Sequence, residues 1–248
     1  MGLVAPRESP APQSTAGPVP RSGGAPAQSP VSRACRSCVN PMLRAAHAAA
    51  SCVPRLATRR ARCLPLRVLA AELQRVASHL VAIGFFFQDL GALATPLMYC
   101  FRFREKILDL FEMLCGARIT VSYMRPGGVL QDAPEDFWPA VDRFLEEMPG
   151  YLDELNQLLT ENEIVVGRTW NTGVLSAEAA INCSTSGPVL RSTGVKWDLR
   201  KADPYDIYDR MEFDIPTGTG GDNYDRFWVR IQEIHQSIRM VRQCIQQI

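Results

Sequence analysis

The chain has 248 residues, of which 46% are hydrophobic and 21% charged, which is the composition of a soluble globular protein with one or two domains. Its formal net charge of +1 hides an uneven distribution: residues 1–70 carry ten arginines and one acid, net +9, whereas residues 71–248 carry net −8. The acidic larger part excludes a uniformly basic nucleic-acid-binding protein. Eight cysteines in this length exclude a disulfide-dense mini-protein.

Residues 1–65 are predicted to be a disordered, Arg/Pro/Ala-rich leader. The first 32 residues show no apolar period, so they cannot bury enough surface to offset the entropy of ordering. No apolar signal-peptide core is present. Three interpretations of the leader remain open: an organelle transit peptide, a disordered tail, or wrongly assigned coding sequence.

The cysteines do not predict a metal site. A lone CxxC motif lacks the second close pair that zinc sites use, so we interpret the leader cysteines as free thiols. The other cysteines are single residues. The residues concerned are Cys35, Cys38, Cys52 and Cys63 with His47 in the first part, and Cys100, Cys115, Cys183 and Cys244 in the second.

Folded structure is predicted from Leu66 onward, where apolar residues recur at helical spacing. The most apolar stretch, residues 80–101, is long enough to span a membrane, but Asp89 and Pro96 interrupt it. We therefore predict two buried helices of a soluble bundle, joined near residues 94–96. A buried carboxylate is costly, so Asp89 is expected either to pair with a basic group or to handle protons. His79 is interpreted as a core or flanking histidine.

Further elements follow in chain order. A helix from Arg104 should end at Gly116, and a turn should follow at residues 123–128. Residues 134–159 predict a long helix that Pro149 kinks or splits. Short elements with a helix start at Ser176 make a small mixed α/β region plausible in residues 164–218.

The final segment has the clearest pattern. Apolar residues from Phe227 to Ile248 alternate spacings of four and three, which predicts a helix with a heptad seam, capped by Asp222 or Asn223. The pattern runs to the last residue, so we expect a chain shortened relative to a longer protein. The preceding glycine-rich loop, residues 217–222, lacks the lysine of a phosphate loop and is interpreted as a connection.

The fold class predicted from these elements is mainly α, a long-helix bundle with a small mixed α/β region after a disordered N-terminal segment. Several motifs in residues 66–248 resemble one family, the 49 kDa (or D) subunits of respiratory complex I, NADH:quinone oxidoreductase. The motifs are AELQRVASH (71–79), DLGA (89–92), YMRPGGV (123–129), EAAIN (178–182), SGPVLR (186–191), GVKWDLRK (194–201), PYDIY (204–208) and GDNYDR (221–226).

The resemblance implies a peripheral-arm subunit in the electron transport of a respiratory chain. Such a subunit packs against the subunit that carries the terminal iron–sulfur cluster and forms one wall of the quinone cavity. It binds no cofactor itself; quinone is the substrate, and NADH and the iron–sulfur clusters belong to partner subunits. The fold is related to nickel–iron hydrogenase large subunits, but their nickel-binding cysteine pairs have no match here, so no metal and no nucleic-acid partner are expected.

The resemblance also implies site residues. Asp89 matches the family aspartate that pairs with a quinone-site histidine, which favours the proton-handling interpretation, and Val81 and Phe85 match positions of the cavity wall. Their spacing of i, i+4 and i+8 puts all three on one helical face. The family usually has threonine at the position of Phe85, so this ring is expected to narrow the cavity.

Other departures leave two functions open. Residues 1–65 do not resemble the family's N-terminal part, which carries the quinone-site His and Tyr, and residues 66–248 look truncated at both ends. The first function is a subunit of the NADH:quinone oxidoreductase, a translocase, with the isolated chain inactive. The alternative is a non-catalytic fragment that acts only in docking or assembly. The expected location is peripheral, on the cytoplasmic face of a bacterial plasma membrane, or else on the matrix side of the mitochondrial inner membrane.

Overall fold

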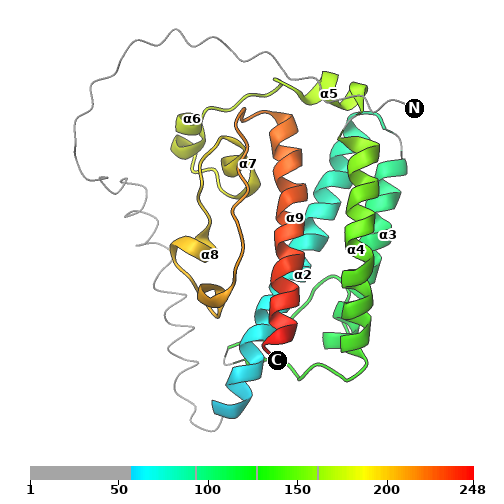
Figure 1. Cartoon of the computed structure of the whole chain (residues 1–248), viewed down its shortest axis with the longest axis vertical. Helices are drawn as coiled ribbons and strands as arrows, with labels where there is room; N and C mark the ends of the chain where they lie inside the picture. Colours follow the sequence, from blue (N-terminus) through cyan, green and yellow to red (C-terminus); the bar gives the residue numbers. More distant parts are fainter. Residues whose placement is uncertain (1–56, 93, 127, 161) are drawn as a thin grey trace, which may run out of the picture. The chain divides into compact units, whose positions relative to one another are not determined.

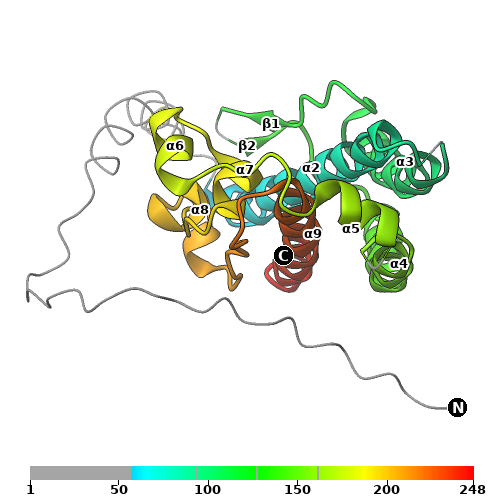
Figure 2. The same cartoon turned by 90° about the horizontal axis from the view of Figure 1, so that it is seen from above.

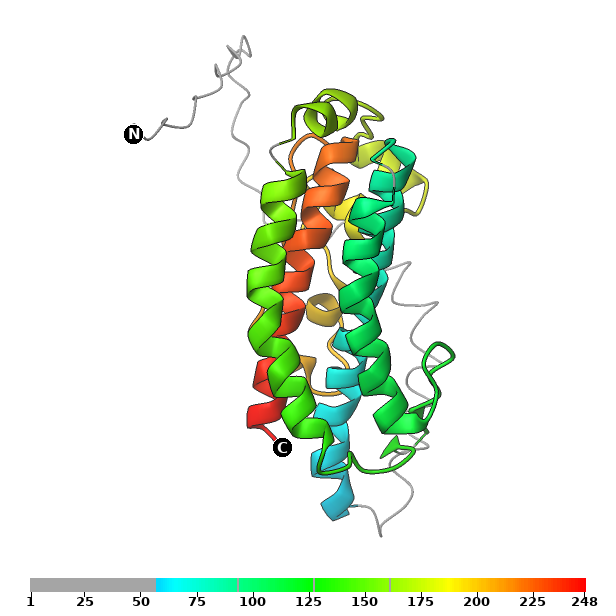
Figure 3. The ribbon, with the colours of Figure 1, turned by 90° about the vertical axis from the view of Figure 1, so that its right-hand side faces the viewer.

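Four long helices build the main body of the chain in a computed structural model that describes residues 57–92, 94–126, 128–160 and 162–248. They are α2 (Ala57–Asp89), α3 (Thr95–Cys115), α4 (Phe137–Leu159) and α9 (Asn223–Gln246). Helix α2 packs against α3 and α9, and α4 packs against the same two helices. The four run side by side with alternating direction, as Figures 1 and 3 show. The predicted mainly helical bundle is confirmed.

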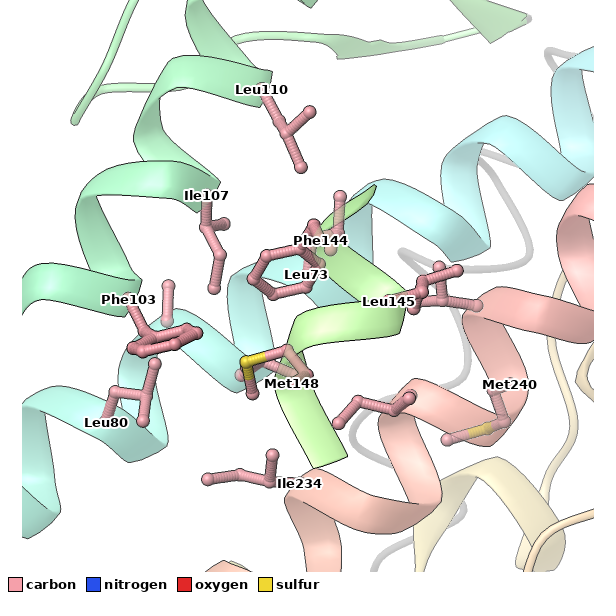
Figure 4. Close-up of a cluster of buried hydrophobic side chains, with 14 of the residues drawn as sticks. Leu73, Leu80, Phe103, Ile107, Leu110, Phe144, Leu145, Met148, Ile234 and Met240 are labelled. Atoms are coloured by element: carbon pink, nitrogen blue, oxygen red, sulfur yellow. The ribbon is translucent and has the colours of Figure 1, made fainter. Parts of the chain in front are cut away.

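The core lies between these helices because each presents an apolar stripe at helical spacing. On α2 the buried stripe alternates steps of three and four from Leu66 to Phe87. On α9 the predicted seam is confirmed, with Phe227, Ile231, Ile234, Ile238 and Val241 all buried. Figure 4 shows side chains of α2, α3, α4 and α9 meeting in this core.

The helix ends follow local rules, with two differences from prediction. Gly116 ends α3 with φ of 72°, and Asp222 caps α9 by accepting a hydrogen bond from the backbone N–H of Asp225. Helix α2 begins at Ala57, before the predicted start at Leu66, because the preceding Ala and Arg residues are good helix formers. Pro149 does not split α4, which continues from Phe137 to Leu159.

The segment expected to be mixed α/β contains only short helices in its described residues. These are α5 (Glu163–Thr169), α6 (Ala177–Asn182), α7 (Gly187–Ser192), α8 (Leu199–Ala202) and the 3-10 helix η2 (Tyr208–Arg210). Side chains fix their starts: Asn162, Ser176 and Asp198 each accept backbone N–H bonds at a helix N-terminus. Figure 2 shows α6, α7 and α8 on one side of the α2–α9 pair, with α3 and α4 on the other.

The two described strands lie instead in the turn predicted at residues 123–128. β1 (Met124–Arg125) and β2 (Gly128–Val129) form a two-stranded antiparallel hairpin. Loop 216–221 is confirmed as a connection that leads into α9. The leader's predicted disorder, the CxxC pair, His47 and Cys52 lie outside the described residues.

One helix among the described residues, from Arg62 to Asp89, is long and apolar enough to cross a membrane. In its most apolar window, 61% of the residues are buried inside the protein. That burial against α3 and α9 is the arrangement expected of a core helix in a bundle, as the sequence predicts.

Candidate functional site

The three residues expected to line the site lie along one face of α2, as their spacing predicts. Val81 is half-buried, the Phe85 side chain is 46% exposed and Asp89 is exposed. The core positions of the same helix, among them Leu80 and Phe87, are fully buried on a different face. The candidate site is therefore on the outer surface of the bundle and not inside it.

Asp89 differs from expectation, because it is exposed and not buried. It is the last residue of α2, where the chain leaves the bundle through a turn in which Gly91 has φ of 90°. Asp89 makes no hydrogen bond or ion pair with any residue in the described part of the chain. A basic partner is thus not found among these residues, and the proton-handling role stays a prediction.

The turn after Asp89 is held by a long-range hydrogen bond. Arg168 of α5 donates from Nη1 to the carbonyl oxygen of Leu90 at 2.6 Å. Within the turn, the N–H of Ala92 returns to the carbonyl of Phe87 at 3.1 Å. The end of α2 that carries the candidate site is therefore tied to α5.

Phe85 packs on the neighbouring helix. Its ring meets the ring of Phe101 on α3 edge to face, with centroids 6.0 Å apart, and the guanidinium of Arg104 lies over the same Phe101 ring at 5.5 Å. These contacts fix the direction of a large apolar side chain that remains partly in solvent.

A groove of about 370 Å³ lies next to Val81, between α2, α3 and the loop after α3. Its volume is in the range of small ligand pockets or of a site for a protein side chain. The lining includes Gln74, Ser78 and Val81 of α2, Arg104 of α3, and Arg118 with Ile119 of the loop.

A network of buried charges, which local sequence patterns do not predict, lies on the inner face of α2. Glu72 is completely buried and accepts hydrogen bonds from Arg200 Nη1 (3.0 and 3.1 Å), Tyr208 Oη (2.6 Å) and Ser237 Oγ (2.7 Å). Arg200 also donates from Nη2 to Asp198 at 2.6 Å. One carboxylate thus joins α2, α8, η2 and α9.

The second half of the network is centred on Glu233 of α9. Its carboxylate accepts a bond from Arg191 Nε at 2.6 Å and lies 2.7 Å from His79 Nε2. Burial lowers the pKa of His79 below 6.5, although the bond with Glu233 opposes this shift. Burial alone would raise the pKa of Glu233, but the bonds from His79 and Arg191 lower it. The pair is therefore a neutral imidazole that donates to a carboxylate.

These groups satisfy one another and leave no opening, so the network is a structural clamp between α2, α9 and the short helices. The interpretation of His79 as a core histidine is confirmed by its burial. One clue in the sequence was the presence of Glu72 and Glu233 on the inner faces of apolar helices, where a carboxylate needs partners.

A resident metal has no candidate site in the described part of the chain. No three His, Cys, Asp or Glu side chains there lie close enough to hold an ion together. Cys63, Cys100, Cys115, Cys183 and Cys244 are all free thiols.

Comparison with known proteins gives consistent matches. The family model for the respiratory-chain NADH dehydrogenase 49 kDa subunit matches residues 89–248, more than half of the chain. The NADH-quinone oxidoreductase D subunit of Dehalococcoides mccartyi (strain ATCC BAA-2266 / KCTC 15142 / 195) is 56% identical over 183 residues, which are 74% of this chain and 50% of that protein.

Two further relatives match over the same length. The first of the D subunits of Roseiflexus sp. (strain RS-1) is 49% identical over 183 residues, 74% of this chain and 49% of that protein. The D subunit of Wolbachia sp. subsp. Brugia malayi (strain TRS) is 48% identical, over 74% of this chain and 47% of that protein. The chain spans about half the length of these relatives.

Proposed function

Because the chain belongs to the respiratory-chain NADH dehydrogenase 49 kDa subunit family, we propose that it is a peripheral-arm subunit of NADH:quinone oxidoreductase. In this role it forms part of the quinone-reduction cavity, beside the subunit that carries the terminal iron–sulfur cluster. The assembled complex is a translocase, bound peripherally to the cytoplasmic face of a bacterial plasma membrane through its partners. The relatives' names and the length they share with this chain support the proposal.

The observation that carries the proposal is the common outer face of Val81, Phe85 and Asp89 at the end of α2. A quinone becomes a quinol when it gains two electrons and two protons, one proton on each carbonyl oxygen. The electrons come from the iron–sulfur cluster of the partner. The Asp89 carboxyl, together with a histidine from outside this chain, holds a proton where a quinone oxygen can take it.

The other two residues shape the cavity wall. Val81 and the exposed part of the Phe85 ring offer apolar contacts to the quinone ring and exclude water from it. The chain binds no cofactor of its own in this proposal, since NADH and the iron–sulfur clusters are bound by other subunits. Alone, it has half of a quinone site and is inactive.

A second candidate is a non-catalytic docking or assembly element. It is favoured by the half-length match to the relatives and by the absence of a partner for Asp89 among the described residues. In that case the helix faces bind other subunits, and the quinone cavity is completed by a different chain.

The test is Asp89→Asn in the assembled, membrane-bound complex. We expect quinone reduction to slow by roughly 10²-fold or more, as loss of a general acid typically does, while NADH still reduces the iron–sulfur clusters at the wild-type rate. The matched control is Asp142→Asn, which removes an exposed carboxylate from α4. Unchanged quinone turnover in Asp89→Asn would remove the catalytic role and leave the docking candidate.

A further inference from the structure

The outer strip of α2 carries no charge over most of its length. Residues 76–88 contain no Asp, Glu, Lys or Arg, although Ser78 and Phe85 are exposed and Val81 and Ala82 are only half-buried. Surface helices normally place charged residues on the outward face. An uncharged, partly apolar strip of this kind is typical of the centre of a protein–protein contact.

Beside this strip, the groove contains a guanidinium without an anion. Arg104 is half-buried, its Nε atom is inaccessible to water and unpartnered, and it makes no hydrogen bond or ion pair with any described residue. The ring of Phe101 is its one polar or aromatic contact in the described chain. A half-buried cation loses hydration without compensation unless a counter-charge reaches it.

The other guanidinium of the groove is already neutralised. Arg118 donates from Nη1 to Asp109 at 2.6 Å and to Glu112 at 3.0 Å, and from Nη2 to Glu105. Of the two arginines that line the groove, Arg104 alone is available to an incoming acid. The groove floor supplied by Val81 and Leu108, with Ile119 at 72% exposure on the rim, is apolar.

We propose that this strip and groove dock a segment of another subunit that brings a carboxylate to Arg104 and an apolar side chain to the groove floor. The inference deepens the proposed function and rests on it, since the partner is a subunit of the same oxidoreductase. The strip itself offers only Asp89 as an acid, at its far end, so a segment of different composition fits the groove better than a second copy does. Planar guanidinium–carboxylate pairing gives the contact its register.

The first experiment measures assembly. The tagged full-length chain is expressed in its native host, the complex is purified in mild detergent, and the other subunits recovered per tagged chain are quantified. Arg104→Met should lower that ratio tenfold or more, and Arg104→Lys should lower it less, because lysine keeps the charge but loses the bidentate geometry. The matched control, Arg102→Met on the exposed side of the same helix, should match wild type. Equal melting temperatures of the purified variants exclude misfolding.

The second experiment identifies the occupant. A photo-cross-linking residue at Ile119, in the intact complex, should join a peptide of another subunit that contains Asp or Glu. Reversing that acid to Arg should restore the assembly of Arg104→Glu. A cross-link to a second copy, to lipid, or to a peptide without an acid overturns the proposal, as does wild-type assembly of Arg104→Met.

The outcomes separate this inference from the proposed function. If the wild-type chain never co-purifies with the other subunits, the proposed function fails and the docking site fails with it. If the wild-type chain co-purifies and Arg104→Met assembles equally well, only the docking site is wrong.

Discussion

Replacing Glu72 by glutamine tests whether the buried charge network stabilises the fold. The substitution keeps the shape of the side chain but removes the charge that Arg200 meets at 3.0 Å, leaving the guanidinium with Asp198. Tyr208 and Ser237 can rotate their hydroxyl groups to accept from the new amide, whereas Arg200 can only donate. The main cost is therefore the uncompensated part of a buried cation.

Breaking a buried ion pair by removing one partner typically costs about 3–5 kcal/mol. For a folded part of this size, each kcal/mol lowers the melting temperature by about 2–4 °C, so we expect Glu72→Gln to melt roughly 6–20 °C below wild type. The assay is urea and thermal unfolding of the purified chain, followed by far-UV circular dichroism.

The matched control is Glu105→Gln, which breaks an exposed ion pair with Arg118 and should cost at most about 1 kcal/mol. The double variant Glu72→Met, Arg200→Met removes both charges and should lose less stability than Glu72→Gln alone. A Glu72→Gln chain within about 1 kcal/mol of wild type would refute the reasoning, because the network would then not be the clamp that joins these elements.

Three further predictions use the same unfolding assays. The folded-state pKa values of His79 and Glu233 are both lowered, so the unfolded chain binds more protons in acid; stability should fall as pH drops below 6.5 and again below 4.5, and a flat profile from pH 7 to 4 would contradict this. Phe87→Ala empties a fully buried site and should cost about 3–5 kcal/mol, against less than about 1 kcal/mol for the half-exposed Phe85→Ala; equal losses would contradict the packing. Gly221→Ala should destabilise by at least about 1–2 kcal/mol, because φ is 64° and the new Cβ meets backbone; a neutral result would argue against this turn.

The long helices could be predicted because their signals are local and periodic. The heptad spacing of α9, its cap at Asp222 and the stop at Gly116 were all readable from neighbouring residues. The short helices between residues 163 and 210 were harder, since few residues contribute to each and one capping side chain decides the start. The valines at 165 and 166 lie in α5 because Asn162 caps it.

The candidate site was only partly predictable. Spacing alone put Val81, Phe85 and Asp89 on one face, but whether that face points inward depends on which elements cover it. The expectation that Asp89 is buried came from its apolar neighbours, and it is wrong because α2 ends at that residue. The partners of Glu72 could not be found from local pattern, as Arg200 and Ser237 are 128 and 165 residues away.

That separation has a consequence for how the protein is made. At about 5–20 residues per second, a ribosome needs roughly 8–33 s to travel from Glu72 to Ser237, which lies 165 residues further along the chain. During that interval α2 is complete, but α9, which covers its inner face, does not yet exist. The nascent chain therefore exposes a long apolar helix with an unpaired carboxylate in its middle. The bundle can close only near the end of synthesis, which makes this the stage at which a chaperone or an early partner subunit has the most to protect.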